Sequence, residues 1–156
     1  HKPIEFYAAY FTVRSEDFDG ATALGGRDAV LRRMRNLDQK IKNREASAKE
    51  EAEFDTLQII NEMMARGIEL RGVDLYRSSA SQFLVEDGKI RLPFSSLKGV
   101  GESAAESLAQ ARESGGEYIS VDDLQSRAKV STAVIDTLRS VGALKELPES
   151  SQITLF

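Results

Sequence analysis

Two glycines separated by a single valine, Gly99-Val100-Gly101, constrain the second half of this chain more than any other feature. Glycine allows a sharp backbone turn and a close approach to a ligand because it has no Cβ atom. An apolar turn precedes the triplet at residues 94–97, and two alanines follow shortly after it. The run therefore predicts a short helix and a longer helix joined by a tight hairpin, with Val100 packed between them.

This hairpin is typical of a helix-hairpin-helix unit that holds a nucleic-acid backbone. The first N–H groups of the second helix have no partner within that helix, and the helix dipole adds partial positive charge beside them. Both features suit a phosphate oxygen, and contacts to phosphate alone carry no base specificity. We therefore expect DNA contacts at Lys98, Gly99, Val100, Gly101 and Ser103. The alternative is a tight connection that serves only helix packing.

A second, degenerate hairpin unit is predicted between Asp123 and Leu144. Its turn would be Ala128-Lys129-Val130-Ser131, which has no paired glycines. Lys129, Ser131 and Thr132 would face a DNA backbone if this copy binds. Packing support without direct contact is the favoured interpretation of this copy, and direct contact is the alternative.

The rest of the chain predicts helices and one small β element. Asp87-Gly88 lies between two strand-like runs and is a strong hairpin signal, because both central positions of such a turn favour positive φ. Further short strand-like runs cover 68–70 and 73–76, and a loop is expected over 15–26. The fold class is therefore mainly α with a small β-hairpin element. The predicted helices cover residues 3–12, 27–44, 47–66, 94–97, 102–113, 120–128 and 131–141.

Composition excludes most catalytic and metal chemistry. The 156-residue chain has no cysteine, and its single histidine is His1. A thiolate zinc site, a disulfide and histidine-based catalysis are therefore excluded. Carboxylate pairs such as Asp122-Asp123 stand at predicted helix starts, where they have a capping explanation. We expect no catalytic residue, no metal site and no cofactor in this chain.

The charge balance limits how the chain can meet a polyanion. The net charge is −4, so nucleic-acid contact must be local rather than spread over a basic surface. The predicted helix over 27–44 is the most cationic segment, but acidic residues interrupt it, and such runs are usually solvated faces. No apolar run approaches a membrane span and no signal peptide is present, which predicts a cytoplasmic chain without a membrane partner.

The end of the sequence, Gln152-Ile153-Thr154-Leu155-Phe156, predicts a binding peptide. Two large apolar residues follow an amide side chain at the end of a polar lead that contains Pro148. Exposed apolar anchors of this kind usually bind a partner. A tail folded back on its own domain is the alternative.

Four stretches together resemble a known family: residues 2–11, 61–68 and 91–101, and the final pentapeptide. They resemble the C-terminal end of PolC-type replicative DNA polymerase III alpha subunits of Gram-positive bacteria, over nearly the whole chain. The resemblance implies a distal fingers segment at 1–92, a tandem helix-hairpin-helix duplex-binding module at 93–144, and a flexible tail at 145–156. In that tail Gln152, Leu155 and Phe156 would anchor a sliding clamp.

The same resemblance implies the chemistry and the partners. The parent family consists of DNA-directed DNA polymerases, nucleotidyltransferases that use magnesium, but its palm carboxylates have no matching positions here. We therefore expect a noncatalytic fragment of something longer, located in the bacterial cytoplasm with the nucleoid. Its expected partners are double-stranded primer-template DNA, the sliding clamp and the remainder of the polymerase. A hairpin module of a DNA-repair or recombination protein and a pure packing scaffold are the alternatives.

Overall fold

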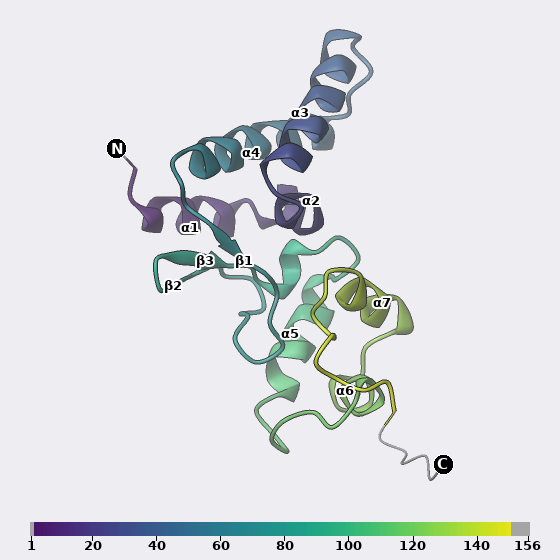
Figure 1. The fold of residues 1–156 in the computed structure, drawn as a ribbon. Coiled ribbons are helices and arrows are strands. Elements are labelled where there is room, and N and C mark those ends of the chain that lie inside the picture. The colour runs from purple at the N-terminus through teal and green to yellow at the C-terminus, as the bar shows by residue number, and fades with distance from the viewer. Residues whose placement is uncertain (1, 151–156) are drawn as a thin grey trace.

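The computed structural model describes residues 2–150 and confirms a mainly α-helical fold with a small sheet. In chain order the elements are α1 Ile4–Val13, the 3-10 turn η1 Ser15–Asp17, α2 Gly20–Leu24, α3 Arg27–Lys42, α4 Ala48–Ala65, β1 Leu70–Arg71, β2 Leu84–Glu86, β3 Lys89–Arg91, the 3-10 turn η2 Phe94–Ser96, α5 Glu102–Ala111, α6 Val121–Ala128 and α7 Thr132–Ser140. Figure 1 shows α1–α4 at one end, the sheet beside them and α5–α7 at the other end.

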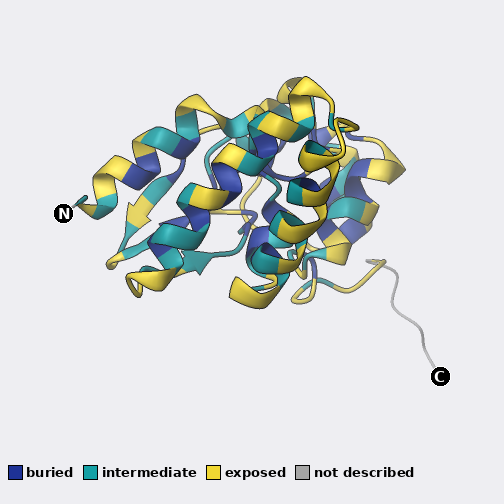
Figure 2. Cartoon of the chain, turned by 90° about the horizontal axis from the view of Figure 1, so that it is seen from above, coloured by how far each residue is buried: buried dark blue, intermediate teal, exposed yellow. Residues whose placement is uncertain are grey.

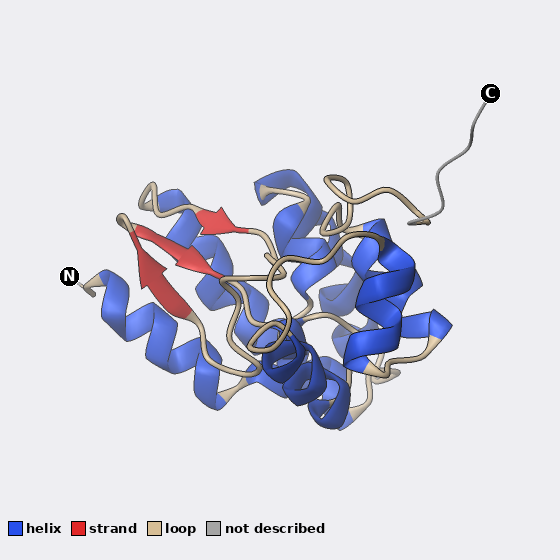
Figure 3. Ribbon diagram, turned by 90° about the horizontal axis from the view of Figure 1, so that it is seen from below, coloured by secondary structure: helices blue, strands red, loops and turns tan. Residues whose placement is uncertain are grey.

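The predicted β-hairpin is present, and a third strand joins it. Asp87 and Gly88 have φ values of 50° and 76°, so both turn positions lie in the left-handed region. β2 pairs antiparallel with β3, and β1 pairs parallel with the other side of β3 (Figure 3). The strand expected over 73–76 was wrong. The Asp74 carboxylate accepts the backbone N–H groups of Tyr76 and Arg77, and this local turn replaces the extended backbone.

The segment 15–26 was predicted as a loop, and this was wrong in its centre, where α2 forms. The Asp19 carboxylate accepts the backbone N–H of Thr22 and so caps the helix start. The helix also lies close to the first hairpin unit: a Cβ atom added to Gly20 would stand 2.9 Å from the carbonyl oxygen of Ser96. A short helix with one cap and close tertiary contacts leaves little periodic signal in a sequence.

α3 and α4 form an antiparallel helix pair. Ser47 and Glu50 make a reciprocal capping box at the start of α4. The Glu50 carboxylate accepts hydrogen bonds from the Lys40 ammonium group and from the Ser47 backbone N–H. These two bonds lower the pKa of Glu50 to about 2. The buried face of α4 includes Thr56 and Met63, whereas Phe54 and Met64 are half-buried.

One continuous hydrophobic cluster runs from α1 to α7. Buried residues lie on the inner faces of the helices and exposed residues on the outer faces (Figure 2). Residues 145–150 were expected to be a flexible lead, yet Pro148 and Glu149 pair with the first residues of α6. The carbonyls of Pro148 and Glu149 accept the backbone N–H groups of Val121 and Asp122 at 2.9 and 3.2 Å. No helix in residues 2–150 is long and apolar enough to cross a membrane.

Candidate nucleic-acid interface

The first hairpin joins η2 to α5 with the predicted geometry. Gly99 has a φ of +98°, a conformation that favours glycine, and Val100 is only 4% exposed. The Val100 N–H donates to the Leu97 carbonyl at 3.1 Å, which closes the turn. Gly101 is extended and starts α5 without a side-chain cap. Val100 therefore packs between the two helical segments, and the left-handed backbone of Gly99 makes the bend.

The start of α5 presents donors that the described part of the chain leaves unused. The first N–H to bond within the helix is that of Ala105, which donates to the Gly101 carbonyl at 2.9 Å. The N–H groups of Glu102, Ser103 and Ala104 meet no acceptor in residues 2–150. Glu102 and Ser103 are exposed. These donors, at the positive end of the helix, form a surface suited to an anion.

The second hairpin repeats this backbone with other residues. Lys129 takes the position of Gly99, with a φ of +56°, and Val130 is 9% exposed. Ser131 takes the position of Gly101 and begins α7 with nearly the same dihedral angles. Its hydroxyl accepts the Val134 N–H at 3.2 Å, so this copy uses one of its own helix-start donors. Lys129, Ser131 and Thr132 are all exposed.

The two hairpin units are packed closely against each other. A Cβ atom added to Gly99 would stand 3.0 Å from the Thr137 hydroxyl on α7. Arg127 on α6 donates to the carbonyls of Ala111, Ser114 and Gly116, which end α5 and form the loop after it. The tandem arrangement is therefore held by contacts of side chains with backbone, which the sequence pattern does not reveal.

Lys98 lies beside the hairpin, as expected, but it has acidic partners that sequence reasoning missed. Its ammonium nitrogen is 3.5 Å from a carboxylate oxygen of Asp19 and 3.5 Å from one of Glu53. Glu53 is 5% exposed and also accepts two hydrogen bonds from Arg33, at 2.8 and 3.1 Å. That hydrogen bonding raises the pKa of Arg33 above its ordinary value. The charges of this four-residue cluster cancel.

A groove of about 830 Å³ runs beside the first hairpin. Its walls come from the end of α1 and η1, the start of α4, and the hairpin itself. The Ser95 hydroxyl on this wall is buried and has no hydrogen-bond partner among residues 2–150. Sequence reasoning did not find the groove, because its walls are distant in the chain. The lining residues are Thr12, Ser15, Glu16, Phe18, Lys49, Ser81, Ser95, Leu97, Lys98, Gly99, Val100, Gly101 and Glu102.

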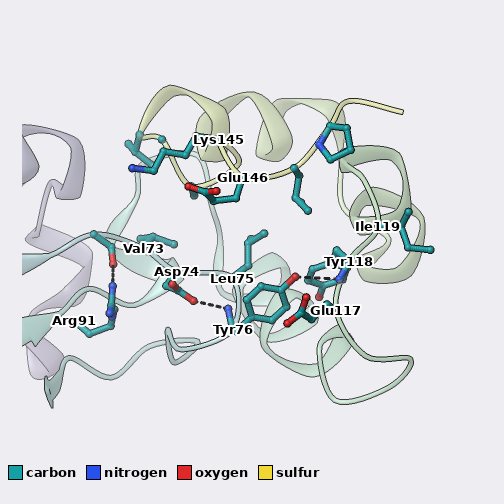
Figure 4. Close-up of a pocket in the computed structure, with 16 residues that line it drawn as sticks. Val73, Asp74, Leu75, Tyr76, Arg91, Glu117, Tyr118, Ile119, Lys145 and Glu146 are labelled. Carbon is teal, nitrogen blue, oxygen red and sulfur yellow. Dashed lines mark hydrogen bonds between the residues drawn. The ribbon is translucent and has the colours of Figure 1, made fainter. Parts of the chain in front are cut away.

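A second hollow, of about 510 Å³, lies where the sheet region meets the hairpin units (Figure 4). The rings of Tyr76 and Tyr118 stack across it at 5.7 Å, and the Tyr118 backbone N–H donates to the Tyr76 hydroxyl at 3.0 Å. The Tyr118 hydroxyl is buried and has no hydrogen-bond partner in the described part of the chain, and burial raises its pKa. This hollow is on the seam between segments rather than at the free amides of α5.

The predicted clamp anchors Gln152, Leu155 and Phe156 lie outside the described residues. Within residues 2–150, no group of three or more histidine, cysteine, aspartate or glutamate side chains is placed to hold a metal ion.

The tandem hairpin geometry defines a class of protein, and residues 67–153 match the family model for the helix-hairpin-helix motif. The chain belongs to this helix-hairpin-helix family. Over 156 residues it is 41% identical to the DNA polymerase III PolC-type protein of Streptococcus sanguinis strain SK36, and over 154 residues it is 43% identical to the same-named protein of Caldanaerobacter subterraneus subsp. tengcongensis. The protein of that name from Thermotoga petrophila is 40% identical over 156 residues.

These matches cover 99 to 100% of the chain but 11% of the length of each relative. The resemblance to PolC-type polymerases that the sequence predicts is thereby confirmed, and the chain corresponds to a fragment of such a protein.

Proposed function

We propose that this chain is a noncatalytic part of a replicative DNA polymerase that holds the backbone of duplex DNA without reading its sequence. The observation that carries the proposal is the set of unpaired N–H groups at the start of α5, beside a hairpin that glycine allows to approach a ligand. The polymerase relatives and the hairpin family support it.

Each hairpin has a defined part in this proposal. The amides of Glu102, Ser103 and Ala104 donate to phosphate oxygens of one strand, and the Ser103 hydroxyl lies next to them. The second hairpin offers Lys129 and the hydroxyls of Ser131 and Thr132. Because Ser131 already accepts the Val134 N–H, we assign this copy the weaker contact. Such contacts fix the register of a duplex and leave the bases unread.

The chemistry of nucleotide transfer is assigned to the remainder of the polymerase. Within the proposal, magnesium and its carboxylate ligands belong to that remainder, because two-metal phosphoryl transfer needs clustered acidic ligands. The contribution of this chain is to hold the product duplex near that site.

The decisive test replaces Gly101 with aspartate. The position accepts a side chain: an added Cβ meets nothing within 4 Å, and aspartate is a favoured N-cap. Gly101→Asp should keep or raise the melting temperature, while its carboxylate occupies the free amides and repels phosphate. We expect duplex affinity, measured by fluorescence anisotropy, to fall by at least about tenfold, or about 1.4 kcal/mol.

Gly101→Asn is the matched control, because it caps the helix without a negative charge. It should lose less affinity than Gly101→Asp. Binding by Gly101→Asp at the wild-type level would show that the α5 amides do not meet DNA.

We further propose that the terminal peptide tethers the polymerase to its sliding clamp. The support is chemical: Gln152 offers an amide, and Leu155 and Phe156 offer two apolar anchors. A tether raises the effective concentration of the duplex grip at the primer end, so modest contacts at two places give long residence. Removal of residues 152–156 should abolish clamp binding in surface plasmon resonance.

The control for the tail is a double change of Ile153 and Thr154 to alanine, which keeps the three anchors. This variant should retain clamp binding. Clamp binding by the truncated chain would place the anchor elsewhere.

A further inference from the structure

The groove beside the first hairpin contains cations that sequence proximity does not bring together. Lys98 and Lys49 both line it, although 49 positions separate them in the chain. Lys98 is the obvious candidate to meet a phosphate, because it adjoins the glycine hairpin. Its charge, however, is matched by Asp19 and Glu53.

Lys49 is in a different electrostatic position. It is the second residue of α4, its side chain is exposed, and it makes no ion pair or hydrogen bond within residues 2–150. The other charged residues on the groove walls are Glu16 and Glu102, which oppose a phosphate. Among the described lining residues, Lys49 is therefore the one cation without a carboxylate partner.

The groove also holds a polar group that lacks a partner. Ser95 precedes the hairpin by a few residues, and its buried hydroxyl makes no hydrogen bond to any residue that the structure describes. Together with the free amides of α5, the groove thus has a donor on the hairpin side and an unpaired cation on the α4 side. A groove with unmatched donors on two walls fits an extended chain of phosphates better than a single ion.

We propose that Lys49 binds a phosphate of the same DNA strand that the first hairpin holds, and that Lys98 acts as a positioning residue for the hairpin. The strand runs along the groove, from the amides at the start of α5 toward the start of α4. This inference rests on the proposed duplex-binding function and deepens it: it assigns the cation of the site to a helix outside the hairpin units.

The test measures duplex binding by the whole chain at several salt concentrations, with a mixed-sequence DNA of about two helical turns. One lysine–phosphate contact contributes about 0.9 to the slope of log affinity against log salt. Lys49→Ala should therefore flatten the slope by about 0.9 and weaken binding roughly 5- to 10-fold near 0.1 M salt. Lys49→Glu should weaken it further.

Lys145→Ala is the matched control. Lys145 is also an exposed lysine that makes no ion pair or hydrogen bond within residues 2–150, but it lines the hollow where the sheet region meets the hairpin units. The Lys145→Ala substitution removes the same charge from the molecule and should leave the slope of log affinity against log salt unchanged. Melting temperatures of the Lys49 and Lys145 variants should equal that of the wild type, because neither side chain makes an ion pair or hydrogen bond within residues 2–150.

The outcomes separate the two proposals. If the wild type binds and Gly101→Asp does not, yet Lys49→Ala keeps the wild-type slope, the Lys49 assignment is overturned and the hairpin assignment stands. Equal slope changes in Lys49→Ala and Lys145→Ala would also overturn it, since they would report net charge alone. If the wild type shows no salt-dependent binding, both proposals fail.

Discussion

At the scale of single residues, Lys129 shows how a hairpin can form without its usual glycine. Its φ of +56° places an ordinary side chain in the left-handed region. That conformation costs a residue with a Cβ roughly 1–2 kcal/mol. Two neighbouring residues offset this conformational cost, because Val130 is buried and Ser131 caps α7. The second hairpin is therefore set by its neighbours rather than by its turn residue.

Lys129→Gly should raise the free energy of unfolding by roughly 0.5–1 kcal/mol, since relief of the left-handed conformation exceeds the added entropy of glycine in the unfolded chain. Urea denaturation measures the change. Ser126→Gly, an exposed position inside α6, is the matched control and should lower stability by roughly 0.3–0.5 kcal/mol. A destabilised Lys129→Gly variant would mean that the lysine side chain itself holds the turn.

At the scale of elements, local signals explain which predictions succeeded. The ends of the long helices and the Asp87-Gly88 turn were predictable because caps and turn residues act within four or five positions. The errors have local causes as well. Asp74 converts an apolar run into a turn, and Asp19 starts a helix of five residues that periodicity cannot detect.

The contacts between elements could not be predicted from sequence. Arg127 appears in the sequence as one more exposed helix cation, yet its guanidinium joins the end of α5 to the following loop and lies 4.4 Å from the ring of Tyr118. Likewise, the positive charge expected on α3 is partly neutralised, because Arg33 and Lys40 form ion pairs with carboxylates of α4. Tertiary packing determines which cations lack a carboxylate partner. Those cations are the ones that can contribute to the candidate site.

At the scale of the whole molecule, the candidate interface divides into a predictable and an unpredictable part. Gly99, Val100 and Gly101 form a contiguous motif, so the sequence alone indicates the hairpin and its free amides. The groove cannot be predicted in this way, because its walls come from α1, α4 and the hairpin, which are distant in the sequence. Lys49 carries no motif, and it becomes a candidate only when its lack of a partner and its place on the groove wall are both known.

The ion pairs of Lys98 link the hairpin to the helices at the other end of the molecule, and this suggests a prediction for stability. Lys98→Met keeps the alkyl stem but removes the charge, so the buried Glu53 loses one of its two cationic partners. Because removing a partner from a buried charge costs more than breaking an exposed pair, we expect a loss of about 1 kcal/mol in the free energy of unfolding.

Lys89→Met is the control: its pair with Glu69 joins side chains that are 41% and 67% exposed, so its loss should be under about 0.5 kcal/mol. A double-mutant cycle with Glu53→Gln should give a coupling of at least about 0.5 kcal/mol. A coupling near zero would mean that apolar contacts alone hold the hairpin against α4.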